Sequence, residues 1–143
     1  MGDYSYNLDR FVAAQRDSYP IALSEIQNGY KRSHWMWYIF PQVAGLGRSS
    51  TSQYYGICDL QEAVEFLHHP VLEHNLIEIS EALLGLTTNN ATEIFGKPDD
   101  KKLRSSMTLF AAAGPEYPVF RKVLEKFFDG REDRRTLRIL NLI

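Results

Sequence analysis

Cysteine is almost absent from this chain of 143 residues, in which Cys58 is the only one. A single cysteine excludes an internal disulfide and a metal cluster built on cysteine thiolates. Such sparing use of cysteine is typical of proteins kept in a reducing compartment, and we expect a cytoplasmic location.

Long apolar runs are also missing. No stretch approaches the roughly 18 apolar residues needed to span a bilayer, and the first ten residues lack the basic start and apolar run of a secretory signal. Charge of one sign is not in excess either, because 16 Lys and Arg stand against 18 Asp and Glu, a net charge of −2. We therefore expect no membrane partner and disfavour nucleic acid, although a local basic patch remains compatible with this balance. Protein partners and oligomeric state stay open.

Hydrophobic and aromatic residues are plentiful, at 44% and 13% of the chain. A chain of this length suits one hydrophobic core, so we expect a single domain over residues 1–143. Most segments between turn signals carry apolar residues at helical spacing, and no alternating run of length occurs outside residues 34–40. The sequence therefore predicts a compact all-α domain, a bundle of about six to eight helices.

Polar residues and prolines mark several predicted helix starts. Asp59 and Asn90 each precede a glutamate by three residues, which is the spacing of a capping box. Asn7 is the expected N-cap of the first helix, and Pro20 is expected to end that helix and open a second one. Pro98 is expected to open another helix further along the chain.

The chemically densest segment is residues 31–42, which hold both tryptophans of the chain. Large aromatic side chains usually pack in the core, so Trp35 and Trp37 fit a purely structural role. They fit equally a stacking wall for a planar or anionic ligand. The polar residues of this segment that suit ligand contacts are Lys31, Arg32, His34 and Gln42.

The next segment, residues 43–52, is a glycine-rich loop. Gly45 and Gly47 allow backbone amides to turn inwards, Arg48 offers a bidentate cation, and Ser49 can cap the helix that follows. These are the parts of an anion-binding nest, but their spacing matches neither a Walker A loop nor a dinucleotide-binding fingerprint. An ordinary turn before a capped helix explains the loop as well.

A third group of polar residues follows Pro98. Lys101, Arg104 and Ser105 recur at helical spacing and share one face, which is typical of a solvated surface. Short polar residues such as Ser105, however, favour the middle of a helix less than long ones do. We therefore expect another helix or a ligand to pack against this face.

Candidates for acid–base chemistry are few. His34 is the only histidine of the dense segment, and we name it with Lys31 as a candidate proton carrier. The four histidines lack metal-binding spacing, and no serine-hydrolase elbow occurs. We expect no metal and no cofactor, and whether the protein is an enzyme stays open.

Several of these strings resemble the bacterial family known as domain of unknown function 1810. The matching segments are residues 31–37, 39–42, 45–49, 67–72, 95–96 and 99–110. The resemblance runs nearly end to end and implies a compact multihelical fold, but it implies no accepted reaction, cofactor or catalytic residue. A second resemblance, in composition alone, is to the all-helical domains that process ADP-ribose and related nucleotides.

Together these features predict a pocket for a small anionic ligand, a nucleotide or an ADP-ribose-like molecule, whose hydrolysis is an open further step. The prediction requires Lys31, Arg48 and Arg104 to meet around one hollow. The alternative is a non-catalytic protein-interaction domain that uses the aromatic segment 34–42. The predicted ligand-binding residues are Arg32, Trp35, Trp37, Gln42, Arg48, Ser49, Lys101, Arg104 and Ser105, and the predicted catalytic residues are His34 and Lys31.

Overall fold

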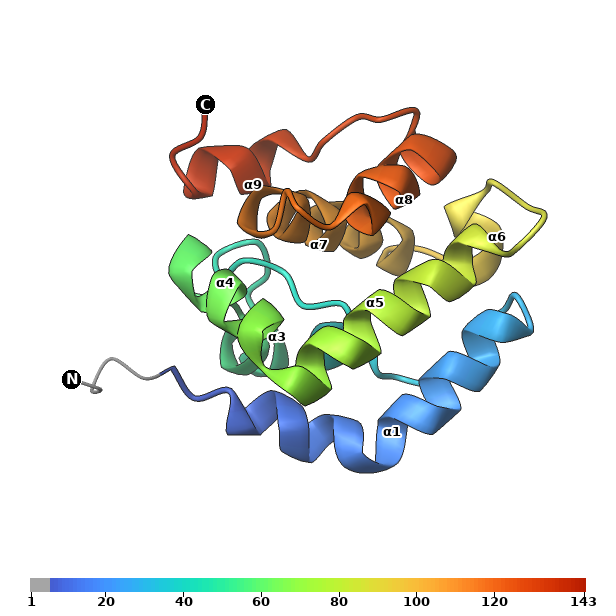
Figure 1. Ribbon diagram of the computed structural model, residues 1–143, viewed down its shortest axis with the longest axis horizontal. Helices are drawn as coiled ribbons and strands as arrows, with labels where there is room; N and C mark the ends of the chain where they lie inside the picture. The colour runs from blue at the N-terminus through green and yellow to red at the C-terminus, as the bar shows by residue number, and fades with distance from the viewer. Residues whose placement is uncertain (1–5) are drawn as a thin grey trace.

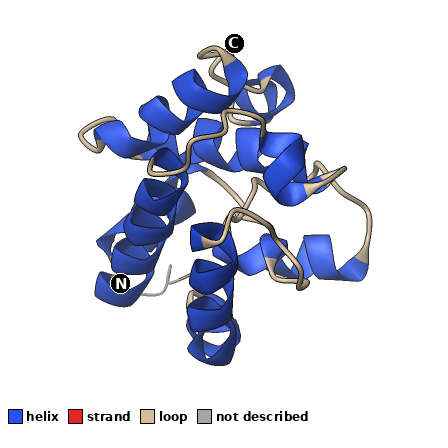
Figure 2. Ribbon diagram, turned by 90° about the vertical axis from the view of Figure 1, so that its right-hand side faces the viewer, coloured by secondary structure: helices blue, strands red, loops and turns tan. Residues whose placement is uncertain are grey.

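The computed structural model describes residues 6–143, so the part of the signal-sequence argument that rests on residues 1–5 lies outside them. Nine helices occur in the described residues: α1 (Asp9–Gln27), α2 (Met36–Ile39), α3 (Ser50–Tyr55), α4 (Leu60–His68), α5 (Pro70–Leu84), α6 (Ala91–Phe95), α7 (Asp99–Ala113), α8 (Pro118–Phe128) and α9 (Arg134–Ile139). Figure 2 shows helices and loops without a strand, and within residues 6–143 the only β pairing is an isolated parallel bridge between Val43 and Ile57. The all-α prediction is confirmed, whereas the predicted number of helices is too low. The four residues of α2 are too few to show a helical period.

The long helix α7 is the element around which the others pack. It contacts α4, α6, α8 and α9, and α5 in turn contacts α1, α4 and α8 (Figure 1). Four fully buried rings link these helices in a row: Phe11, Phe66, Phe110 and Phe120 come from α1, α4, α7 and α8, with successive ring centroids 5.2, 5.1 and 5.9 Å apart. This aromatic row fixes the position of α7, whose first two turns help to form the candidate site.

Two expectations about α1 are wrong. The N-cap is Leu8 rather than Asn7, with no capping hydrogen bond from its side chain, and Pro20 lies inside a continuous helix. The buried face of this helix runs through the proline, because Phe11, Gln15, Tyr19, Ala22 and Ile26 all pack inwards while Pro20 stays exposed. Figure 1 shows α1 changing direction near its middle, as expected where a proline removes a helical hydrogen bond. Neither α1 nor any other helix within residues 6–143 combines the length and apolar character needed to cross a membrane.

The other predicted helix starts are confirmed. The carboxylate of Asp59 accepts the backbone N–H of Glu62 at 2.8 Å, and the side chain of Asn90 accepts that of Thr92 at 2.9 Å. Pro98 directly precedes α7 as its N-cap. Capping hydrogen bonds therefore mark the starts of α4 and α6, whereas α7, which faces the candidate site, begins after a proline without a side-chain cap.

Candidate functional site

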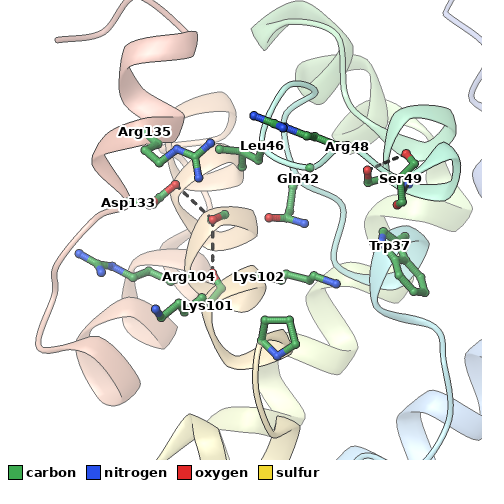
Figure 3. A pocket seen from close by; sticks show the side chains of 14 residues that line it. Trp37, Gln42, Leu46, Arg48, Ser49, Lys101, Lys102, Arg104, Asp133 and Arg135 are labelled. Carbon is green, nitrogen blue, oxygen red and sulfur yellow. Dashed lines mark hydrogen bonds between the residues drawn. The ribbon is translucent and has the colours of Figure 1, made fainter.

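A cleft of about 610 Å³ opens where α7, α9, α2 and the loop before α3 meet (Figure 3). Trp37 lies at one end of the view, and Asp133 and Arg135 lie at the other. The lining residues are Trp37, Gln42, Leu46, Gly47, Arg48, Ser49, Ser52, Pro98, Lys101, Lys102, Arg104, Ser105, Asp133 and Arg135. Segments that are distant in the sequence therefore share one hollow, and this hollow includes Arg48 and Arg104 but not Lys31.

Cations dominate this lining. It contains five Lys and Arg side chains and, among the described residues, a single carboxylate, that of Asp133. Arg48, Lys101 and Arg135 are exposed, and no carboxylate of residues 6–143 lies within ion-pairing distance of them. These three cations come from three different segments and are free to meet an anion.

Arg104, by contrast, is occupied by the protein itself. Its Nε donates to the backbone carbonyl of Arg131 and its Nη2 to that of Glu132, both at 2.8 Å. These bonds tie the loop between α8 and α9 to α7. Arg104 thus builds one wall of the cleft, and its charge contributes to the field there.

Lys102 is shared between a carboxylate and an aromatic ring. Its ammonium lies 3.2 Å from Asp99 and 4.6 Å from the centre of the Trp37 ring, a cation–π distance. The ring of Trp37 is half-buried, and Lys102 and Trp37 both line the cleft. One aromatic face at this end is therefore already covered by a cation.

The short polar residues of α7 are explained by another helix. Ser105 donates to the carboxylate of Asp133 at 3.1 Å, and the Thr108 hydroxyl accepts the backbone N–H of Asp133 at 2.8 Å. Asp133 is in turn the N-cap of α9 and accepts the backbone N–H of Thr136. Small side chains in the middle of α7 thus allow the start of α9 to approach and bond to it. Of the two expected neighbours, a helix or a ligand, the structure shows the helix.

The glycine-rich loop is a turn that leads into a capped helix. Gly45 has φ +101°, which favours glycine, and the Ser49 hydroxyl accepts the backbone N–H of Ser52 at 3.1 Å as the N-cap of α3. Gly47 leaves space for Ser52, because a Cβ at this position would lie 2.8 Å from the Ser52 hydroxyl. The turn and the helix cap account for the glycines and for Ser49 without an anion-binding nest. The loop does place Arg48 in the lining of the cleft.

Four of the predicted site residues do not line the cleft. Trp35 is only 1% exposed, and its indole N–H donates to Glu25 at 2.8 Å, so it is a core residue rather than a stacking wall. Arg32 lies over the ring of Tyr30 and lines a different groove beside α1. His34 is exposed and is not among the residues of the cleft.

Lys31 is the fourth of these residues, and its ammonium is held inside the protein. It pairs with Asp99 at 2.8 Å, donates to the carbonyl of Ser33 and lies over the Trp35 ring, and its side chain is only 7% exposed. The expected meeting of Lys31, Arg48 and Arg104 is therefore realised for the two arginines only. Lys31 reaches the site indirectly, through the Asp99 carboxylate that it shares with Lys102.

The aromatic segment 34–42 offers little free apolar surface. Its buried residues are Trp35, Met36, Ile39, Phe40 and Pro41. Burial in the core does not support the alternative function, in which this segment is the face of a protein-interaction domain.

Cys58 and the histidines give no second site. Cys58 is exposed, and desolvation with the nearby carboxylates of Glu62 and Asp59 raises the pKa of its thiol to about 11. A thiol with so high a pKa is a poor nucleophile near neutral pH. No group of three or more His, Cys, Asp or Glu side chains able to hold a metal ion occurs among residues 6–143.

Sequence reasoning missed four polar residues of the cleft: Ser52, Lys102, Asp133 and Arg135. Lys102 differs from its neighbour Lys101 only in the side of the helix that it occupies. Asp133 carries a usable local signal, because aspartate is a preferred N-cap residue. Nothing local indicated that this start packs against Ser105, 28 positions earlier in the chain.

The fold and the cleft define a small all-α protein with a cationic hollow at the junction of α7 and α9. The chain belongs to the family described as "Protein of unknown function (DUF1810)", whose match covers residues 5–140. It is similar to a solved structure, the conserved hypothetical protein Rv1873 from Mycobacterium tuberculosis. That similarity has 43% sequence identity and a TM-score of 0.93, and it covers 96% of this chain and 99% of that one. A comparison with functionally curated proteins found no match.

Proposed function

We propose that the cleft binds a small anionic ligand, a nucleotide or an ADP-ribose-like molecule. The observation that carries this proposal is the contrast between the charge of the cleft lining and the net charge of the whole chain. A protein with a net charge of −2 gathers five cations around one hollow, and the described residues add a single carboxylate. Such a concentration of one charge focuses the field on a bound anion.

The free cations supply the contacts. Arg48, Lys101 and Arg135 reach the cleft from three segments, so that together they can surround a group with several anionic oxygens. Arginine suits the bidentate geometry of phosphate, and lysine supplies a point charge. Trp37 at the other end of the cleft adds an aromatic ring against which a planar group can pack, beside the ammonium of Lys102. A volume of about 610 Å³ lies within the range of small-molecule sites.

Binding is better supported than hydrolysis. Neither of the candidate proton carriers, His34 and Lys31, lines the cleft, and Lys31 is already paired with Asp99. Among the described residues, the carboxylate that does line it belongs to Asp133, whose Oδ2 is engaged in capping α9. We therefore propose a binding protein, with no catalytic residue assigned.

A thermal-shift screen with nucleotides and sugar phosphates tests the proposal. A ligand present at one hundred times its Kd stabilises the folded protein by about 2.7 kcal/mol, which corresponds to a rise in Tm of about 5–10 °C. In the variants Arg48→Ala, Lys101→Ala and Arg135→Ala we expect about tenfold weaker binding by calorimetry, because each loses one charge-assisted contact. Their unliganded Tm should change little, since these side chains are exposed.

Matched control variants distinguish the loss of a contact in the cleft from the loss of a positive charge elsewhere on the protein. Arg16→Ala on α1 and Lys122→Ala on α8 remove exposed cations that do not line the cleft. We expect both to bind as the unmodified protein does. The proposal is wrong if no member of the panel raises the Tm, or if the control variants weaken binding as much as the cleft variants.

A further inference from the structure

Asp133 supplies the one carboxylate among the described residues of the cleft. Attraction between the cations and an anionic ligand does not explain why this carboxylate is there. A carboxylate opposes anion binding, since it repels the ligand that the five cations attract. Its structural task is to cap α9, and serine or asparagine caps a helix as well as aspartate does. The negative charge of Asp133 is therefore not required by the fold.

Among the described residues, every hydrogen bond that the Asp133 carboxylate accepts goes to one of its two oxygens. Oδ2 accepts the backbone N–H of Thr136 at 3.1 Å, the Thr136 hydroxyl at 2.5 Å and the Ser105 hydroxyl at 3.1 Å. Within residues 6–143 no donor is found for Oδ1. The three bonds hold the side chain in one orientation at the wall of the cleft, beside Arg135 and opposite Trp37 (Figure 3).

From this arrangement we infer that Asp133 selects ligands that carry a hydroxyl group near their anionic group, which makes the ligand class a phosphorylated sugar. An ionised carboxylate only accepts hydrogen bonds, and a sugar hydroxyl donates them. The bond from a hydroxyl to a carboxylate is charge-assisted and stronger than one between neutral groups. The cations hold the phosphate, and Oδ1 of Asp133 holds the sugar. This inference rests on the proposed function, because it assigns a specificity to the same cleft.

Anions without a sugar experience a different balance of attraction and repulsion in the same cleft. Pyrophosphate and other anions without a sugar lack the hydroxyl donor that Oδ1 is inferred to accept, and they bear the repulsion of the carboxylate with less compensation. Asp133 thus acts as a specificity residue: it lowers the affinity for simple polyanions and favours phosphorylated sugars over them.

The experiment compares ADP with dideoxy-ADP, which lacks both ribose ring hydroxyls, and includes inorganic pyrophosphate as a bare anion. For the unmodified protein we expect ADP to bind about tenfold or more tightly than dideoxy-ADP, the effect of one hydrogen bond to a charged group. A parallel titration with ribose 5-phosphate separates two sources of the sugar. Binding equal to that of ADP assigns the site to free sugar phosphates, and much weaker binding assigns it to nucleotides.

The decisive variant is Asp133→Asn. Asparagine is a good N-cap, so α9 stays in place, but the free acceptor becomes an amide and the charge is lost. We expect the preference for ADP over dideoxy-ADP to disappear, while pyrophosphate binds several-fold more tightly. If Asp133 acted only through its charge, the variant would bind all three ligands more tightly by the same factor. If the variant lost structure, it would bind all three more weakly and its Tm would fall. Either of those results overturns the inference.

A control with the same change of charge is Asp129→Asn, at an exposed position with φ +56° that asparagine tolerates and that does not line the cleft. We expect this variant to keep the ADP preference of the unmodified protein. If the unmodified protein binds pyrophosphate and ADP but does not distinguish ADP from dideoxy-ADP, the inference is wrong and the proposed function stands. If it binds none of the probes, both are wrong.

Discussion

Glu25 is the residue around which the dense segment is arranged. Its carboxylate accepts the backbone N–H groups of Arg32 and Ser33, the Ser33 hydroxyl and the indole N–H of Trp35, at 2.5–3.1 Å. Desolvation raises the pKa of this carboxyl, but the four hydrogen bonds outweigh it and lower the pKa from 4.5 to about 2. One ionised side chain on α1 thus fixes the loop that leads to α2 and Trp37.

The low pKa makes this contribution to stability depend on pH. Because the folded protein holds Glu25 ionised, the stabilisation is complete above pH 4.5 and is lost as the pH falls towards 2. We expect Glu25→Gln to lower the free energy of unfolding by about 2 kcal/mol at neutral pH. The difference between variant and unmodified protein should shrink over that acid window, as measured by urea unfolding at several pH values.

Glu81→Gln is the matched control for Glu25, since Glu81 is an exposed glutamate of α5. We expect it to change the unfolding free energy by less than about 0.5 kcal/mol. A Glu25→Gln difference that stayed constant from pH 7 to pH 3 would contradict the assigned role of the ionised carboxylate.

At the residue scale, the sequence indicated which side chains have suitable chemistry better than it indicated which of them are already bonded within the protein. Arg48, Lys101, Arg104 and Trp37 were singled out as candidates and do line the cleft. That Arg104 is bound to two carbonyls was not predictable, because those carbonyls belong to a loop 27 and 28 positions further along the chain. Nor does any local pattern distinguish Trp35, which is enclosed, from Trp37 two positions later.

At the scale of elements, α1 is joined to α4 by a buried ion pair. Arg10 on α1 lies 2.8 Å from Glu62 on α4, and their side chains are only 8% and 2% exposed. Arg10 also donates to the carbonyls of Tyr54 and Gly56, at the end of α3. One guanidinium therefore holds three helices together.

Loss of Arg10 would leave a buried carboxylate without its partner. We expect Arg10→Met to lower the free energy of unfolding by about 3–5 kcal/mol, measured by chemical denaturation. The double variant Arg10→Met with Glu62→Leu should regain much of that loss, since it removes the uncompensated charge. Arg16→Met, an exposed arginine of the same helix, is the control. A loss below about 1 kcal/mol for Arg10→Met would show that the pair is not a structural tie.

Helix boundaries were predictable where the signal is local. Asp59 and Asn90 cap their helices through their own neighbours, and both were identified from spacing alone. Pro20 was misread because its effect depends on packing. The face of α1 that packs inwards is buried on both sides of the proline, against α5 and α2 among others, and this burial keeps the helix continuous with a bend.

At the scale of the whole molecule, charge is distributed unevenly. The chain is slightly acidic, yet five of its sixteen Lys and Arg residues line one cleft. Attraction of an anion to such a cleft acts over a distance and is screened by salt, with a Debye length of about 10 Å at 0.1 M and about 3 Å at 1 M.

Ligand binding should therefore weaken as salt is raised. Over that range we expect the affinity for ADP to fall by about tenfold or more, measured by calorimetry at several concentrations of sodium chloride. Removal of one free cation, as in Arg135→Ala, should reduce the slope of this dependence. An affinity that did not respond to salt would mean that the ligand is held by uncharged contacts and that the cations are incidental.

The contrasting surroundings of the two tryptophans have a practical consequence. Trp35 is sealed in the core against a carboxylate, so its fluorescence reports whether the chain is folded. Trp37 borders the hollow beside a lysine ammonium, so its emission is sensitive to whatever enters there. The protein thus carries two intrinsic optical probes, one for integrity and one for occupancy, and replacing either indole by phenylalanine isolates the signal of the other without an attached dye.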